Sequence, residues 1–427
     1  MRLLLLTLTV VMLHFAPVAI AQGNGWDEAD WEDGWDIEEP TGIPIYGFVE
    51  AAAGSRLSAS PYHARLSLGE LRLRLGTDYT WRGATFTAKG DALYDEVINS
   101  WQTDIRELNL QFSLLDNLDL KAGRQILTWG TGDYLFLNDL FPKDWQSFFS
   151  GRDDEYLKAP SDAIKLSAYF DWFNIDLAWT PKFDADRYIS GERLSRFNPL
   201  TGSVGGNSVV MTVDQPSGDE VAIRLFKTVK GTEWALYGYD GYLKSPEALT
   251  PAKLPTFSRL RVWGGSMRRP FAAGIVNVEA AYHASLDDPR GDRPFVPNDQ
   301  WRLLVGYEQE LMTRLTGGFQ AYLEHTQEYD SLLAELPAGQ PLPDENRVVL
   351  TSRLTWQNEG ADLTLSLFTF YSPTANDGYL RPTLDYRLDD HWSFTTGLNL
   401  FFGEQRQTFF KQFNDNNNLY LRVRYAF

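Results

Sequence analysis

Charged residues occupy every second position in several apolar stretches of this sequence. The stretch LRLRL places Arg72 and Arg74 between leucines, and LRVRY near the C-terminus places Arg422 and Arg424 between Leu, Val and Tyr. Such alternation puts apolar side chains on one face of a β-strand and charged side chains on the other. Charged groups that surround a water-filled space can bind or select passing ions. These residues therefore indicate recognition of small polar or charged solutes.

The candidate pore-lining residues share one feature, a polar side chain set between apolar neighbours that point the other way. They are Arg72, Arg74, Lys121, Arg224, Arg259, Arg261, Arg302, Arg353, Arg387, Arg422, Arg424, Glu308 and Asp385. Because buried ions cost several kcal/mol each unless they are paired, charges of both signs predict water inside. The alternative is a structural network that fills a narrow barrel.

A second set of candidates lies in the long segment 123–163, which is rich in Trp, Gly, Asp and aromatic residues. Its DLFPKDWQSFF stretch is too apolar to stay in water, so we expect it to fold inward against a barrel wall and narrow the pore. The charged candidates of this constriction are Asp133, Asp144, Arg152, Asp153, Asp154 and Lys158. Gly130 and Gly132 allow a tight turn there. The alternative is a lid that rests outside on neighbouring loops.

The residue types that catalysis needs are scattered. His63, His283, His325 and His391 stand in unrelated places, without a serine or an acid at a telling spacing. The paired acids of the loops lack the spacing of a recognised calcium loop. The sequence therefore predicts no enzyme, no cofactor and no metal site.

The elements that must position these charges are strands. From Ile45 onward the hydropathy has period two, with tight connections such as VKGTE at 229–233 and SMRRPF at 266–271 alternating with long polar segments such as 181–219. Short turns at one end and long loops at the other are typical of a transmembrane antiparallel β-barrel. We predict an all-β barrel of about 18 strands, with 16 as the alternative, short periplasmic turns and long extracellular loops. A soluble sandwich would not need such long loops.

Three segments are predicted along the chain. Residues 1–21 have the basic start, apolar run and small-residue site of a secretory signal peptide. Residues 22–42 form an acidic tail with three tryptophans and no strand or helix period, and residues 43–427 form the barrel. The tail is expected to be a solvated tether, a plug for the lumen, or, through residues 22–40, a dock for a periplasmic protein.

The composition limits the possible partners. The net charge of −18 disfavours nucleic acid, and the absence of cysteine excludes disulfides and covalent haem attachment. Aromatic residues make up 14% of the chain, which suits aromatic girdles in contact with outer-membrane lipid. The last strand ends on Tyr425 and Phe427, a spacing that resembles the insertion signal read by the barrel assembly machinery.

One motif carries a resemblance. GRQILTWGTGD, followed by NDLFPKD and YLKAPSDAIKLSAYF, resembles porin-like outer-membrane proteins of poorly defined function that share a GRQ...WG...D...P.D pattern after the fifth strand. More broadly, the chain is similar to 18-stranded barrels of the alginate-export type. The resemblance implies a monomeric barrel, and the alginate-export likeness implies an arginine-rich lumen that attracts a polyanion.

The sequence thus predicts a porin-like channel in the cell outer membrane of a Gram-negative bacterium, passing small polar or charged solutes. The alternative is a structural barrel of a larger efflux or electron-transfer complex, which holds a periplasmic partner.

Overall fold

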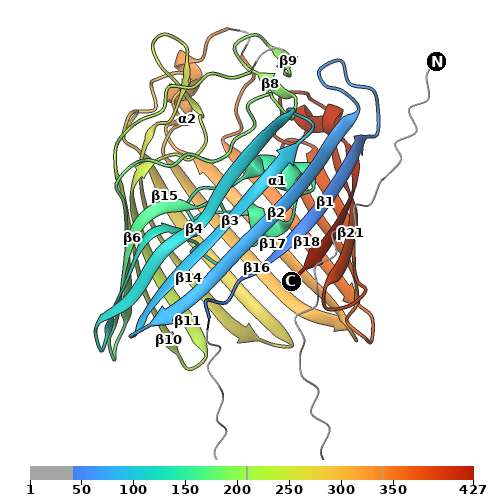
Figure 1. Cartoon of the computed structure of the whole chain (residues 1–427). Helices are drawn as coiled ribbons and strands as arrows, with labels where there is room; N and C mark the ends of the chain where they lie inside the picture. The colour runs from blue at the N-terminus through green and yellow to red at the C-terminus, as the bar shows by residue number, and fades with distance from the viewer. Residues whose placement is uncertain (1–41, 208–209, 339) are drawn as a thin grey trace, which may run out of the picture. The chain divides into compact units, whose positions relative to one another are not determined.

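The computed structural model describes residues 42–207, 210–338 and 340–427. The compact unit Ile43–Phe427 is an antiparallel β-barrel (Figure 1). The predicted signal peptide 1–21 and, apart from Gly42, the predicted tail 22–42 lie outside the described residues. No helix in the described part of the chain combines the length and the hydropathy that a membrane crossing needs.

Eighteen strands of the described chain form one closed sheet, in which neighbours along the wall follow one another in sequence and β22 pairs with β1. They are β1 (Tyr46–Arg56), β2 (Leu66–Trp81), β3 (Ala84–Asp95), β4 (Ser100–Leu115), β5 (Leu118–Gln125), β6 (Ser161–Tyr169), β7 (Asn174–Thr180), β10 (Glu220–Val229), β11 (Thr232–Tyr242), β14 (Arg259–Phe271), β15 (Gly274–Ser285), β16 (Gln300–Met312), β17 (Leu315–Thr326), β18 (Asn346–Gln357), β19 (Leu363–Ser372), β20 (Asp377–Arg387), β21 (Trp392–Gly403) and β22 (Asn418–Ala426). The prediction of 18 strands is confirmed, and the alternative of 16 is wrong.

The remaining elements lie in the connections. They are two short hairpins, β8 (Arg196–Asn198) with β9 (Ser203–Gly205) and β12 (Ala248–Leu249) with β13 (Pro255–Thr256), two α-helices, α1 (Trp145–Ser150) and α2 (Tyr329–Glu335), and two 3₁₀ turns, η1 (Asp154–Leu157) and η2 (Lys411–Asn416).

The two ends of the barrel differ in their connections. At the turn end the links are short, as at Lys230 and Gly231, whose φ angles of 50° and 76° are the left-handed values of a two-residue hairpin turn. The links at the loop end are mostly long, although 96–99 and 373–376 are also short. The predicted turn at 266–271 is wrong, because β14 continues to Phe271 and the chain reverses at 272–273. Its polar residues Arg268 and Arg269 are exposed at the turn end of β14.

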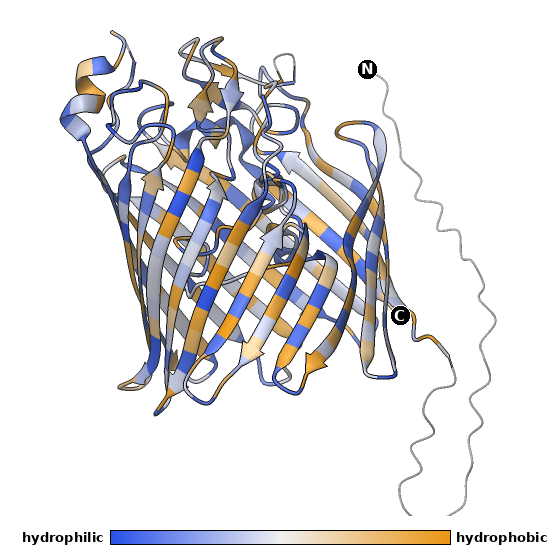
Figure 2. Cartoon of the chain, turned by 90° about the vertical axis from the view of Figure 1, so that its left-hand side faces the viewer, coloured by the Kyte–Doolittle hydropathy of each residue, from blue (hydrophilic) through white to orange (hydrophobic). Residues whose placement is uncertain are grey.

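The alternation predicted from the sequence gives the wall two faces. On β2, Leu71 and Leu73 are exposed on the outside, whereas Arg72 and Arg74 between them are buried on the inside. Figure 2 shows the result as alternating orange and blue bands along the strands. An apolar outer face and a polar inner face are what lipid outside and water inside require.

The main apolar core lies inside the barrel. It joins inward-facing aromatic residues of the wall, such as Tyr379 and Phe401, to apolar side chains of the segment that connects β5 with β6. A core in this position fixes that segment within the lumen.

Candidate pore constriction

The segment 126–160 between β5 and β6 enters the barrel, where α1 and η1 lie surrounded by strands (Figure 1). Phe148 and Phe149 of α1 are buried, and the ring centroid of Phe149 lies 5.4 Å from that of Tyr379 and 5.2 Å from that of Phe401. Both partners face inward from β20 and β21. The apolar DLFPKDWQSFF stretch thus packs on the wall from within.

A wall carboxylate holds the turn at the start of the segment. Glu279 of β15 accepts hydrogen bonds from the backbone N–H groups of Thr131 and Gly132 and, at 2.9 Å, from the Asn138 side chain. Gly130 has a φ of 83°, and a Cβ there would lie 3.1 Å from the Glu279 carboxylate. The two glycines of WGTGD therefore let the backbone wrap around this carboxylate.

A buried charge cluster holds the middle of the segment. The Asp139 carboxylate lies 3.0 Å from Lys143 Nζ and 2.6 Å from Lys158 Nζ. Burial alone would raise the pKa of Asp139, but the two ammonium groups outweigh it and lower that pKa. Burial lowers the pKa of Lys143, and Asp139 opposes this effect. Because a buried charge without its partner is strongly destabilising, this cluster holds the parts of the segment around Lys143 and Lys158 together.

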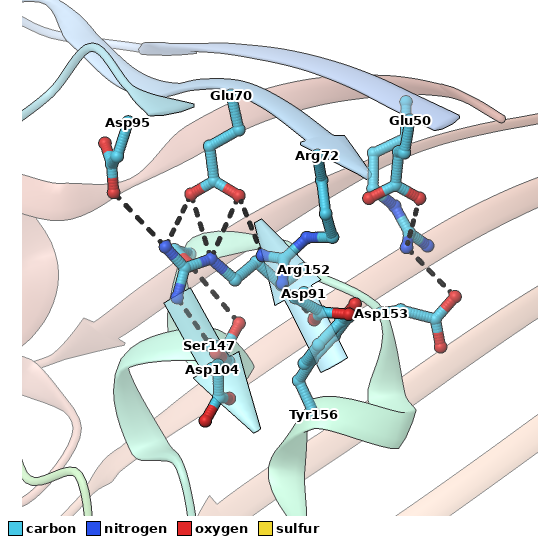
Figure 3. Close-up of polar contacts among 12 residues, drawn as sticks. Glu50, Glu70, Arg72, Asp91, Asp95, Asp104, Ser147, Arg152, Asp153 and Tyr156 are labelled. Atoms are coloured by element: carbon cyan, nitrogen blue, oxygen red, sulfur yellow. Dashed lines mark hydrogen bonds and ion pairs between the residues drawn. The ribbon is translucent and has the colours of Figure 1, made fainter. Parts of the chain in front are cut away.

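Four consecutive charged residues at the tip of the segment each meet a charge of opposite sign on the wall. Arg152 lies 2.6 Å from Glu70 of β2 and 3.3 Å from Asp95 of β3 (Figure 3). Asp153 Oδ2 lies 3.1 Å from Arg422 Nη1 and 3.0 Å from Arg424 Nη2, both on β22.

The next two residues of the tip contact two other positions on the wall. Asp154 pairs with Arg381 of β20 at 2.5 Å, and Glu155 pairs with Arg74 of β2 at 2.5 Å. The Asp154 and Glu155 side chains are still 51% and 39% exposed, so they are the most exposed members of this set.

A tyrosine at the tip organises the arginines of the wall. The Arg72, Arg74 and Arg106 guanidinium carbons lie 4.2, 4.9 and 4.9 Å from the Tyr156 ring centroid. The Tyr156 hydroxyl accepts a hydrogen bond of 2.6 Å from Arg74. Stacking on an aromatic face lets like charges approach one another, because the ring quadrupole attracts each cation.

Two cavities lie on either side of the tip. The cavity towards the loop end has a volume of about 680 Å³ and is lined by six carboxylates and four guanidinium groups, including Arg152. The cavity towards the turn end has a volume of about 270 Å³ and is lined by Asp153, Arg387, Arg422 and Arg424, among others. Arg152 and Asp153 are adjacent in sequence but line different cavities. The chain at 152–153 therefore stands between the two compartments.

Most of the predicted pore-lining residues lie on the inner phase of their strands. These are Arg72, Arg74, Lys121, Arg224, Arg302, Arg353, Arg387, Arg422, Arg424, Glu308 and Asp385. Most of them are paired: Arg353 lies 2.6 Å from Asp133 of the inward segment, and Arg224 lies 2.7 Å from Glu233. Within the described residues, Arg387 forms no ion pair and lines the turn-end cavity.

Two predicted pore residues lie on the wrong face. On β14 it is Leu260 and Val262 that are buried inside, whereas Arg259 and Arg261 share the outward phase of exposed Trp263. Leu260 and Val262 pack in the core around the inward segment. At the loop end of β14 the usual polarity of the two faces is therefore reversed. The inner face is apolar because it packs against the inward segment, and the outer face carries the two arginines.

The remaining predicted constriction residue has a structural task. Asp144 caps α1 by accepting a hydrogen bond of 2.7 Å from the Ser147 N–H, and it lies 3.2 Å from Arg187.

Residues that line the same region but were not predicted are Asp91, Asp95, Arg106, Arg187 and Arg193. Asp91 and Asp95 share the inner phase of β3 with Leu93 and alternate with Ala92 and Tyr94, a pattern that the sequence shows. Arg187 and Arg193 come from the loop 181–219, which has no strand phase to read.

The histidines are spread over the barrel. His283 is buried in the inner wall with its ring 2.9 Å from the Leu137 carbonyl, and His391 lies at the turn end beside the Ala426 carbonyl. In the described ranges, no three His, Cys, Asp or Glu side chains are grouped so that they could hold a metal ion.

Solved structures give the fold a wider context. OccK5 (OpdH) of Pseudomonas aeruginosa is 12% identical with a TM-score of 0.53, and the match covers 90% of this chain and 97% of that one. The chain has the fold of an outer-membrane porin. OccAB3 of Acinetobacter baumannii is 10% identical at a TM-score of 0.53, covering 90% and 98% of the two chains. OccD3 (OpdP) of P. aeruginosa is 12% identical at 0.51, covering 91% and 92%.

At these identities the likeness concerns the fold alone. No protein-family model matches the sequence, and no curated protein is similar enough to count as a match.

Proposed function

We propose that this protein is a channel in the outer membrane of a Gram-negative bacterium and that small polar or charged solutes pass through it. The observation that carries this proposal is the position of residues 152–153, which stand between two cavities of about 680 and 270 Å³ inside an 18-stranded barrel. The proposed role is transport rather than catalysis. The alternative of a barrel that houses a periplasmic partner has no supporting observation within the described residues, and its proposed dock, residues 22–40, lies outside them.

The charges of the lumen favour small solutes over a polyanion. Carboxylates outnumber guanidinium groups in both cavities, and most of the arginines at the tip are already paired with acids. A polyanion of the kind implied by the alginate-export resemblance would need a continuous run of unpaired cations. Small solutes need only the exposed edges of Asp154, Glu155 and Arg387.

Planar-bilayer recording tests the proposal. Purified, folded barrel is expected to give discrete conductance steps in KCl, with a reversal potential under a salt gradient that reports the preference for cations or anions. Folded protein that inserts without conductance steps would overturn the channel.

Acid is expected to loosen the tip at Asp153. Burial raises the pKa of this carboxyl, but Arg422 and Arg424 outweigh burial and lower the pKa to about 2 from 3.8. The lowered pKa means that the ionised form stabilises the docked tip above pH 3.8 and that this contribution is lost as the pH falls towards 2. Single-channel conductance should therefore stay level from neutral pH to about 4 and change below it.

The variant Asp153→Asn should have, already at neutral pH, the conductance that the unaltered chain reaches in acid. Its conductance should change little when the pH falls below about 4. Asp362→Asn is the matched control, because Asp362 lines the same cavity and its carboxylate forms no ion pair in the part of the chain that the structure describes. If the conductance of Asp153→Asn changes below about pH 4 as that of the unaltered chain does, another titrating group causes the change.

The last residue is proposed to serve assembly. Phe427 is half exposed, and it exchanges backbone hydrogen bonds of 2.9 and 3.0 Å with Gly47 where β22 meets β1. Deletion of Phe427 should lower the amount of folded, heat-modifiable barrel in the membrane fraction. Arg422→Gln with Arg424→Gln should insert as the unaltered chain does, because both face the lumen. Normal insertion without Phe427 would remove its proposed role as a signal for the barrel assembly machinery.

A further inference from the structure

Two arginines of β14 face away from the lumen at the loop end of the barrel. The Arg259 and Arg261 side chains are 43% and 45% exposed, and both share the outward phase of Trp263. A solute that moves through the barrel cannot reach them. Anything that binds them must therefore contact the outside of the wall.

The two guanidinium groups share one carboxylate. Arg259 Nη2 lies 2.7 Å from Asp240 Oδ1, and Arg261 Nε lies 2.7 Å from Asp240 Oδ2. The same carboxylate orients both groups, and the three side chains together keep one positive charge. Asp287 also lies close by, since its carboxylate accepts a hydrogen bond of 2.7 Å from the Arg259 backbone N–H, but within the described residues it forms no ion pair with either guanidinium group. The planar donors of the two arginines suit a phosphate as a second anion.

Aromatic residues mark the level of these arginines. The Trp263 ring stacks on Tyr282 of β15 at 6.3 Å, and Tyr282 lies 4.8 Å from Trp301 of β16. Trp263 and Trp301 are exposed, and Arg261 is the next outward residue towards the loop end on β14. Trp and Tyr belts lie at the boundary between the hydrocarbon and the lipid headgroups. Arg259 and Arg261 therefore lie at headgroup depth, where lipid phosphates are found.

We propose that Arg259 and Arg261, held by Asp240, bind the phosphate group of a membrane lipid on the outer surface of the barrel. Two observations favour a lipid phosphate. Arg259, Arg261 and Asp240 together carry one net positive charge, and the adjacent aromatic residues place them at the depth of the lipid headgroups. The proposal rests on the barrel lying in a membrane, as the proposed function requires, but it does not depend on conduction.

Native mass spectrometry of the detergent-solubilised full barrel tests this site. The probe is phosphatidic acid, with a diacylglycerol of the same chains as the lipid that lacks phosphate. The unaltered protein should retain phosphatidic acid over diacylglycerol, and Arg259→Gln with Arg261→Gln should weaken that retention about tenfold, as expected for the loss of charge-assisted hydrogen bonds. Added inorganic phosphate should not displace the lipid, because it lacks the chains that pack on Trp263.

Arg269→Gln is the matched control, because Arg269 has the same outward phase on β14 but lies at the turn end. The proposal would be overturned if Arg269→Gln weakened the retention of phosphatidic acid as much as the double variant does. It would also be overturned if the unaltered protein retained diacylglycerol equally well, or if inorganic phosphate displaced the lipid. A shift of the Gln variant from oligomer to monomer, with lipid retention unchanged, would also overturn it and assign the patch to a contact between copies. Conductance of the Gln variant should equal that of the unaltered chain, so a failure of the channel and a failure of the lipid site remain distinguishable.

Discussion

Phe149→Ala should widen the pore and make its single-channel current fluctuate between conductance levels. The Phe149 ring anchors α1 to Tyr379 and Phe401 inside the wall, and α1 leads directly into the charged tip at 152–155. Loss of a buried phenyl group costs about 3–5 kcal/mol. Phe148 still packs on Tyr379, so the loss should weaken the docking of α1 and let it leave the wall more often. The expected readout is a several-fold higher single-channel conductance with frequent transitions between levels.

Phe402→Ala is the control for this experiment. Phe402 follows Phe401 on β21, but its ring points outward and is partly exposed. Its replacement by alanine therefore removes a phenyl group from the lipid face instead of the lumen. Heat-modifiable mobility on gels should show that both variants form barrels. A folded Phe149→Ala barrel with the conductance of the unaltered chain would show that α1 does not narrow the pore.

Reversal of the arginines on β22 should give the largest change in ion selectivity. Arg422→Glu with Arg424→Glu places two new carboxylates beside Glu50 and Asp153, which these arginines now neutralise. One unit charge at 4 Å changes the energy of an ion by about 1 kcal/mol even in water. The preference for cations over anions should therefore rise by roughly tenfold or more, which the reversal potential under a KCl gradient measures.

The control makes the same change of charge on the outer face. Lys227 and Arg269 both lie near the turn end on outward phases of β10 and β14, so Lys227→Glu with Arg269→Glu alters the net charge equally without entering the lumen. Its reversal potential should match that of the unaltered chain. Equal shifts in both double variants would indicate a surface-charge effect, and no shift in either would place the ion path elsewhere.

The alternation of single strands was enough to predict the class of fold and the direction of most lumen side chains. Arg72 and Arg74 on β2, and Arg422 and Arg424 on β22, face inward as expected, because lipid outside and water inside impose a period of two. Arg259 and Arg261 did not follow, because the inward segment buries Leu260 and Val262 and so exchanges the usual polarity of the two faces.

Partners, by contrast, could not be predicted from local sequence. Asp153 and Arg422 are 269 positions apart, and the fourfold pattern of pairs at 152–155 exists only when β2, β3, β20 and β22 surround the tip. Arg193 reaches Asp95 from a loop without any periodicity. Pairing of this kind depends on distances between strands, and a single strand pattern carries no information about them.

The sequence by itself determined the barrel, its two ends and the presence of an apolar inward segment, because hydropathy and turn residues act over a few neighbouring positions. The tertiary structure decided where the lumen is divided, which charges are neutralised there and which two arginines stand outside. The first two depend on closure of β22 on β1, which brings the first and last strands of the barrel to the same tip. The third depends on the inward segment, which packs on Leu260 and Val262.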